Sequence, residues 1–140
     1  MDWITDSIAI GNYLDAGNPD LRRSNGIRSM ICLNGELRGV RPELLELDAL
    51  DNYDLKDGPG NNPDIFRRVV RTVARFARCH PNLLVQCHAG RSRSVVVVAA
   101  YLMQSNGWTA NNALAFIASK REIALTAGIE KLLEIPFRSA

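Results

Sequence analysis

The sequence predicts an α/β fold in which helices flank a mostly parallel central sheet. Segments that favour strands gather in the first half of the chain, whereas the second half carries mainly helical patterns. Between two helical segments, residues 83–85 form a short, continuously apolar run, which is typical of a buried parallel strand. Strands of this kind are buried between layers of helices.

The first half of the chain contains three candidate strands and one short helix. Residues 7–13 alternate weakly between apolar and polar and predict the first strand. The order Asn-Pro-Asp at 18–20 places a capping residue before a proline, which opens a short helix that Gly26 ends. Residues 27–33 predict the next strand, and another lies between residues 45 and 55, with its register left open.

Residues 62–79 predict an amphipathic surface helix. Apolar residues recur at helical spacing on one face, and five arginines occupy the other, most economically as a solvated face. The sequence His-Pro-Asn at 80–82 then stops this helix ahead of the apolar strand.

Three helices follow the strand at 83–85. Residues 93–105 are apolar nearly all round, which predicts a helix at the buried centre of the domain, and Asn-Gly at 106–107 ends it. A further helix spans about 109–121 behind a threonine cap, and a last helix spans about 126–135.

The composition predicts one soluble globular domain over residues 1–140, with 46% hydrophobic and 23% charged residues. A formal net charge of +2 gives no general affinity for nucleic acids or membranes, so any basic site is local. The longest apolar stretch, 95–103, is much shorter than the roughly 20 residues of a membrane span. The amino terminus lacks the pattern of a secretory signal, and we expect a cytoplasmic protein, a monomer by default.

The segment 85–94, Val-Gln-Cys-His-Ala-Gly-Arg-Ser-Arg-Ser, joins the apolar strand to the buried helix. At such a junction, backbone N–H groups without internal partners meet the positive end of the helix dipole and bind phosphate. Cys87 opens the loop and Arg93 closes it, so a thiol and a guanidinium share the anion site. The dipole and the arginine favour the nucleophilic thiolate. Arg93 can hold two phosphate oxygens bidentately, and Gly90 lets the backbone turn its amides inward.

These residues match the signature C-x-x-G-x-x-R-[ST], and the chain resembles the dual-specificity branch of the cysteine-dependent protein tyrosine phosphatases over nearly its whole length. Gly-Ile at 26–27, Tyr-Leu-Met at 101–103 and the helical segment 112–117 followed by Lys-Arg also match. Low-molecular-weight phosphatases carry such a loop near the amino terminus, and rhodaneses have a different loop, so its position here favours the dual-specificity branch. The resemblance implies a phosphatase-type α/β sandwich.

The resemblance also implies a phosphocysteine intermediate. Cys87 would attack phosphorus, the loop amides and Arg93 would stabilise the phosphoryl oxygens, and Ser94 would assist release of the cysteine. No metal ion or organic cofactor is implied. The residues expected to bind the phosphate are His88, Ala89, Gly90, Arg91, Ser92 and Arg93.

Members of this family protonate the leaving group with an aspartate from a loop just ahead of the amphipathic helix. Asp57 has that place, in a Gly/Pro/Asn-rich loop that could carry it to the substrate. Asp54 is the competing candidate.

Four positions in and beside the loop carry further expectations. Gln86 replaces the histidine that most of the family has before the nucleophile, and because glutamine carries no charge, we expect weaker thiolate activation. The side chain of His88 should face the rim of the pocket. Arg91 is either solvated or in contact with a second phosphate or an acidic substrate flank. Ser92 is interpreted as a loop filler whose amide matters more than its hydroxyl.

Three cysteines, widely spaced, form neither a disulfide framework nor a zinc site, so we expect free thiols. Cys32 and Cys79 are interpreted as packing residues. Because Cys32 lies on a predicted strand near the active edge, a protective disulfide with Cys87 under oxidation stays open.

The leading hypothesis is a phosphomonoester hydrolase acting on phosphotyrosine in proteins, with phosphoserine and phosphothreonine as further candidates. A second hypothesis keeps the chemistry but takes a non-protein substrate: an inositol phosphate, a phospholipid headgroup or an RNA 5′ phosphate. A third, raised by Gln86, is a weakly catalytic phosphate-binding module. The expected partner is a phosphorylated protein or peptide, and no membrane or nucleic-acid partner is expected.

Overall fold

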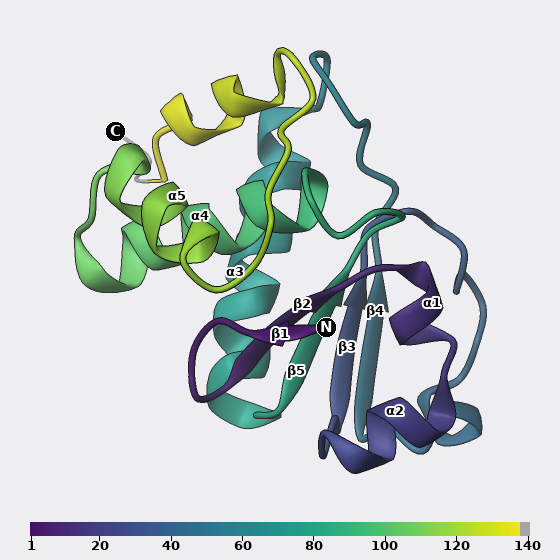
Figure 1. The fold of residues 1–140 in the computed structure, drawn as a ribbon. Helices are drawn as coiled ribbons and strands as arrows, with labels where there is room; N and C mark the ends of the chain where they lie inside the picture. The colour runs from purple at the N-terminus through teal and green to yellow at the C-terminus, as the bar shows by residue number, and fades with distance from the viewer. Residues whose placement is uncertain (138–140) are drawn as a thin grey trace.

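The structure is a computed structural model, which describes residues 1–137 and contains a five-stranded sheet in the order β1-β2-β5-β3-β4 (Figure 1). β1 pairs antiparallel with β2, and every other neighbouring pair is parallel. The mostly parallel sheet with its flanking helices confirms the predicted fold class. The strands are β1 (Asp2–Trp3), β2 (Ile8–Gly11), β3 (Ser29–Cys32), β4 (Ala49–Asn52) and β5 (Leu83–Gln86).

The helices begin where the sequence supplies caps. Asn18, Asn62 and Thr109 each accept a hydrogen bond from a backbone amide of the following first turn. The helices are α1 (Tyr13–Ala16), α2 (Pro19–Ser24), α3 (Pro63–Cys79), α4 (Arg93–Asn106) and α5 (Ala110–Ala118), with 3₁₀-helices η1 (Pro42–Leu45) and η2 (Ile129–Glu134). The four predicted strands and the predicted helices at α2, α3 and α4 are therefore confirmed.

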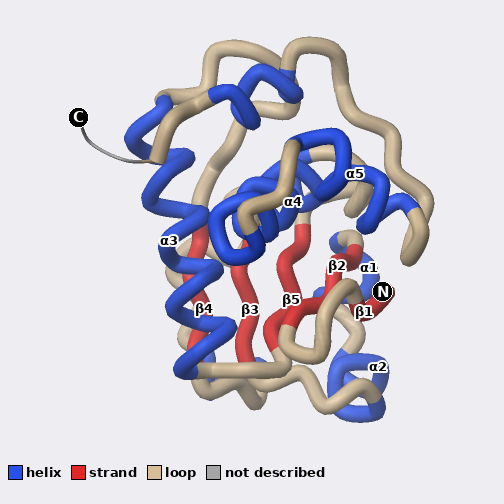
Figure 2. The backbone as a smooth tube through the Cα atoms, turned by 90° about the vertical axis from the view of Figure 1, so that its left-hand side faces the viewer, coloured by secondary structure: helices blue, strands red, loops and turns tan. Residues whose placement is uncertain are grey.

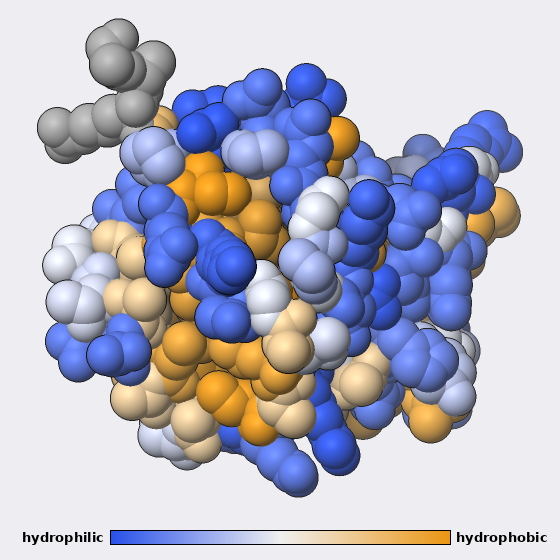
Figure 3. Space-filling view, turned by 90° about the horizontal axis from the view of Figure 1, so that it is seen from above, coloured by the Kyte–Doolittle hydropathy of each residue, from blue (hydrophilic) through white to orange (hydrophobic). Residues whose placement is uncertain are grey.

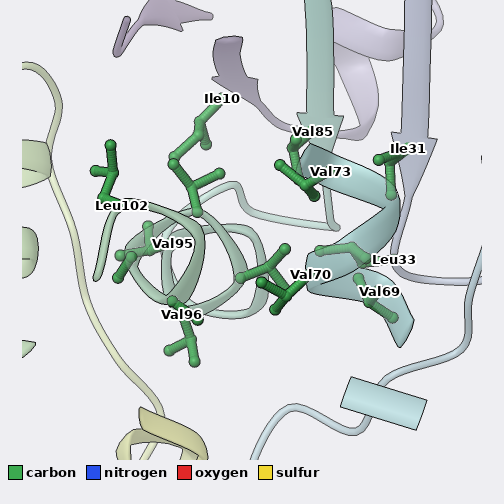
Figure 4. Close-up of a cluster of buried hydrophobic side chains, with 14 of the residues drawn as sticks. Ile10, Ile31, Leu33, Val69, Val70, Val73, Val85, Val95, Val96 and Leu102 are labelled. Atoms are coloured by element: carbon green, nitrogen blue, oxygen red, sulfur yellow. The ribbon is translucent and has the colours of Figure 1, made fainter. Parts of the chain in front are cut away.

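Helices cover both faces of the sheet (Figure 2). α3, α4, α5 and η2 pack on one face through the main core, whereas α1 and α2 lie on the other. The valines at 95–98 of α4 are fully buried, as the apolar pattern of this helix predicts. Figure 4 shows Val73 of α3 beside Val85 and Ile31 of the sheet, with Val95 and Val96 of α4 in the same cluster. This packing fixes α4 behind the central strand, β5.

Two short elements near the amino terminus escaped prediction. β1 has two residues, and α1 is a single turn held by a capping box in which Asn12 and Asp15 exchange side-chain to backbone hydrogen bonds of 2.9 Å. Neither element is long enough to produce a periodic apolar pattern.

The predictions for the two C-terminal helices were wrong in extent. α5 ends at Ala118 rather than near residue 121, because the chain turns there to bring the guanidinium of Arg121 to the carbonyl of Ile10 on β2. The amide of Thr126 donates to Ser92 over 3.0 Å, and residue 126 lies outside the helix. The final helix starts after Gly128, whose φ of +92° is left-handed, and it is a 3₁₀-helix.

The C-terminal segment completes the cover of the main core. Seen from above, apolar side chains gather in the half of the molecule that carries α5 and η2, while polar side chains cover most of the other half (Figure 3). Phe116, Leu125 and Ile135 are partly buried and pack against the core. None of the helices within residues 1–137 is long and apolar enough to cross a membrane.

Candidate active site

The segment containing Cys87 lies at the centre of the sheet's carboxyl edge. β2, β5, β3 and β4 are parallel, so their carboxyl ends meet at one edge, and Cys87 directly follows β5. The thiol is buried, with 2% exposure, and α4 begins at Arg93. The strand, loop and helix thus have the arrangement that α/β folds use to bind ligands.

The backbone of this loop is turned for anion binding. The carbonyl of His88 accepts the amide of Tyr13, and the carbonyl of Arg91 accepts the amide of Ala124, both over 3.0 Å. The amides of residues 88–93, by contrast, donate to no acceptor within the described chain. No side chain caps the start of α4 either. Free N–H groups and the positive end of a helix of 14 residues therefore remain available to an anion.

Gly90 makes the turn of the loop through a close backbone contact that the sequence did not reveal. Its φ is +68°, and a Cβ atom there would lie 2.6 Å from the carbonyl oxygen of Gly11, at the end of β2. Arg121 fills the space beside this contact: its guanidinium donates to the carbonyl of Ile10 and to the carboxylate of Asp2, each over 2.8 Å. β1, β2 and the segment after α5 thereby support the loop from behind.

Ser94 is the nearest polar partner of the candidate nucleophile. Its buried hydroxyl lies 3.2 Å from Cys87 Sγ, at the second residue of the helix that follows the loop. At this distance the hydroxyl can donate a hydrogen bond to a thiolate.

Arg93 is partly buried at the first position of α4. One of its terminal nitrogens donates to the carbonyl of Leu55 over 3.1 Å, which ties the arginine to the segment that leads to Asp57. The guanidinium forms no ion pair with a carboxylate of residues 1–137, so its other N–H groups can face an anion.

The two candidate acids have different surroundings. Asp57 accepts a hydrogen bond from Ser92 over 2.7 Å, so its carboxylate touches the loop. Asp54 is exposed and lies beside a different segment, 3.7 Å from the guanidinium of Arg38. The structure therefore brings Asp57, and not Asp54, together with the phosphate loop.

The prediction that Ser92 merely fills the loop was wrong. Its side chain is 6% exposed, and its hydroxyl donates to Asp57 while accepting the amide of Thr126. Three segments that are distant in the sequence meet at this one hydroxyl. No local sequence pattern predicts such a contact.

Gln86 points away from the loop interior and toward the neighbouring strand. Its side chain is 1% exposed, and its amide nitrogen donates to Cys32 Sγ over 2.6 Å. The amide oxygen is buried without a partner within the described residues. Cys32 is buried as predicted, and the three cysteines are free, whereas Cys79 is exposed at the end of α3, so its interpretation as a packing residue was wrong.

The rim of the site carries His88 and Arg91, both exposed. The imidazole of His88 stacks on the ring of Tyr13, with ring centroids 4.4 Å apart and planes within 7°. Arg91 is 3.8 Å from the carboxylate of Glu122. Sequence reasoning missed Tyr13, because its contact with the rim depends on how α1 packs. Within residues 1–137, no group of three or more His, Cys, Asp or Glu side chains could hold a metal ion.

Comparison with known proteins identifies the family. Residues 55–134 match the family model described as dual specificity phosphatase, catalytic domain. The chain is 29% identical over 121 residues to Dual specificity protein phosphatase 1 of Arabidopsis thaliana, covering 86% of this chain and 60% of the relative. It is 45% identical over 73 residues to Tyrosine-protein phosphatase yvh1 of Schizosaccharomyces pombe, covering 51% of this chain and 22% of the relative. The chain thus spans less than two thirds of either relative.

Solved structures share the fold. The human tyrosine phosphatase-like serine/threonine/tyrosine-interacting protein superposes with a TM-score of 0.79 at 26% identity, covering 96% of this chain and 93% of that one. Human DUSP28 superposes with a TM-score of 0.80 at 20% identity and the same coverage, a likeness of fold alone. Because the family match covers more than half of the chain and includes Cys87 and Arg93, the chain belongs to the dual specificity phosphatase family.

Proposed function

We propose that this chain hydrolyses phosphomonoesters in proteins, with phosphotyrosine as the leading substrate and phosphoserine and phosphothreonine as further ones. The observation that carries the proposal is the loop over residues 87–93, where a buried thiol, backbone amides without protein acceptors and an arginine follow one another. Family membership supports this reading.

In the first step, the thiolate of Cys87 attacks phosphorus and the bond between phosphorus and the leaving oxygen breaks. The leaving oxygen takes the proton of Asp57, whose place beside Ser92 supports this role. The amides of the loop and the fork of Arg93 stabilise the charge on the phosphoryl oxygens. The products of this step are the dephosphorylated substrate and a phosphocysteine.

In the second step, water attacks the phosphocysteine, the sulfur–phosphorus bond breaks and inorganic phosphate leaves. Asp57, now a carboxylate, accepts the proton of the attacking water. The hydroxyl of Ser94 donates to the departing thiolate, a role that the 3.2 Å separation of the two atoms supports.

The test compares hydrolysis of p-nitrophenyl phosphate by the wild type, Cys87→Ser and Arg93→Lys. We expect no turnover by Cys87→Ser. For Arg93→Lys we expect a loss of about 100-fold or more in kcat/KM, because the lysine ammonium cannot bind two phosphate oxygens bidentately as the planar guanidinium does. Both variants should unfold at the wild-type temperature. Equal rates for the wild type and Cys87→Ser would refute the proposal.

A second candidate function is a phosphate-binding module with little turnover. It is favoured by Gln86, whose neutral side chain is directed to Cys32 and supplies no charge to the thiol. The 26% identity to a phosphatase-like interacting protein supports it as well. A single-turnover assay with a phosphotyrosine peptide separates the two functions: fast phosphate release excludes the module, whereas tight binding without release excludes the enzyme. A panel of inositol phosphates, phospholipids and 5′-phosphorylated RNA tests the non-protein substrates.

A further inference from the structure

The outer face of α3 carries a row of arginines that the site does not use. Arg68, Arg71, Arg75 and Arg78 are exposed, and we call these four residues the arginine row. Their spacing of three, four and three residues keeps them on one side of the helix. The opposite side of α3 packs into the main core, so the position of the row is fixed by the fold.

The four arginines of the row have no acidic partner, whereas six other arginines within residues 1–137 each pair with a carboxylate. Within residues 1–137, none of its four members forms an ion pair. Elsewhere, the exposed Arg23 pairs with Glu46 over 2.6 Å, and Arg28 pairs with Asp48 over 2.7 Å. A net charge of only +2 makes this local excess of positive charge a property of the surface of α3, not of the whole chain.

The arginines of the row make only uncharged contacts, so most of their N–H groups remain available to bind an anion. Arg71 reaches the carbonyl of Phe137 over 3.4 Å, and Arg75 lies over the ring of Phe76, 5.6 Å from its centroid. Successive members of the row are three or four residues apart, where like charges repel and weaken a helix. An anion bound along the row would remove that repulsion.

The row borders an open hollow, whose lining residues all belong to α3. Arg68, Arg71 and Arg75 line a cavity of about 700 Å³ together with Asp64 and Thr72. Asp64 is already engaged, because it pairs with Arg67 over 2.7 Å.

The floor of the hollow is joined to the edge of the sheet. The hydroxyl of the buried Thr72 lies 2.9 Å from that of Tyr53, which directly follows β4. β4 is one of the two edge strands, and in Figure 2 α3 lies in the helix layer over this side of the sheet. The hollow is therefore built on a helix that is hydrogen-bonded to the residue following β4.

We propose that the arginine row binds an acidic, extended segment of a partner protein. Ten residues of helix span about 15 Å, which about five residues of an extended chain match, since such a chain rises about 3.3 Å per residue. Guanidinium groups bind carboxylates bidentately, and the hollow provides room for such a chain.

The same features disfavour the other polyanions. The lining of the hollow contains no apolar side chain that could insert into a bilayer and no aromatic side chain on which a base could stack. The inference does not rest on the proposed function, because binding along α3 does not need turnover at Cys87.

The experiment measures fluorescence anisotropy of a labelled ten-residue peptide in which Glu and Ser alternate, with Gln replacing Glu in a neutral control peptide. The row variant carries Arg68→Gln, Arg71→Gln and Arg75→Gln. The matched control carries Arg41→Gln, Lys120→Gln and Lys131→Gln, which are exposed positions without ion pairs within residues 1–137. Both triple variants remove the same charge.

We expect the wild type to prefer the Glu peptide, with an affinity that falls as salt is added. The row variant should bind the Glu peptide about tenfold more weakly than the wild type, because it loses three charge-assisted contacts. The affinity of the control variant should stay within about twofold of the wild type. Hydrolysis of p-nitrophenyl phosphate should be unchanged in both variants, and neither variant should unfold at a lower temperature than the wild type. Equal affinity for the two peptides, equal losses in the two variants, or tighter binding to phosphatidylserine vesicles or single-stranded DNA would overturn the inference.

Discussion

The hydroxyl of Ser92 donates a hydrogen bond to the carboxylate of Asp57 over 2.7 Å and accepts the amide of Thr126 over 3.0 Å. The donor belongs to the phosphate loop, and the carboxylate belongs to a loop of glycine, proline and asparagine residues ahead of α3. Because the hydroxyl is buried, this bond restricts where the carboxylate can go. Ser92 is thus a candidate positioning residue for the proposed acid.

Replacing Ser92 with alanine should lower kcat about tenfold with little change in KM, because a misplaced acid acts on the transition state and not on ground-state binding. In an Asp57→Asn background the same replacement should cost almost nothing. Ser119→Ala is the control, since that hydroxyl donates only to the carbonyl of Phe116 on its own helix. A loss from Ser92→Ala that is equal in both backgrounds would show that Ser92 acts independently of Asp57.

Asp57→Asn and Asp54→Asn should separate the two candidate acids. A general acid works only while protonated, so the rate falls on the alkaline side, and asparagine at the acid position should remove that fall and lower kcat about 100-fold. The loss should be larger for phenyl phosphate than for p-nitrophenyl phosphate, whose leaving group needs less protonation. Asp54→Asn should keep the wild-type profile, because its carboxylate faces Arg38. A wild-type profile for Asp57→Asn would show that the acid is another group.

The part of the site formed by consecutive residues can be predicted from the local sequence, whereas the contacts between distant segments cannot. Cys87 and Arg93 are recognisable because strand, loop and helix follow one another, and each has a pattern of its own. The contacts of Gly90 with Gly11 and of Ser92 with Thr126 join segments distant in the chain, and they depend on packing that no periodicity reports. The same holds for the early end of α5, which follows from where Arg121 finds its partners.

Gln86→His should increase the reactivity of Cys87. A charged imidazole at position 86, next to Cys87 in the chain, adds positive charge near the thiol and favours the thiolate, whereas glutamine is always neutral. The measurement is the rate of alkylation by iodoacetamide between pH 5 and 7 in a Cys79→Ser background, since Cys79 is the exposed thiol. We expect alkylation about tenfold faster than with Gln86, and Gln86→Met, a neutral control, should show no gain. Equal rates for Gln86 and Gln86→His would show that this position does not activate the thiol.

Gly90→Ala should be far more damaging than Gly26→Ala, although the two glycines have φ values of +68° and +69°. The left-handed backbone alone costs an alanine about 1–2 kcal/mol, and Gly26 has no heavy atom within 4 Å of the added Cβ. At Gly90 the Cβ would meet the carbonyl of Gly11 at 2.6 Å, and the resulting backbone shift adds about 1–3 kcal/mol. Thermal unfolding measures the difference, and phosphatase activity should be lost in Gly90→Ala alone, because the shift moves the loop amides. Equal destabilisation by the two substitutions would mean that the end of β2 yields to the loop rather than supporting it.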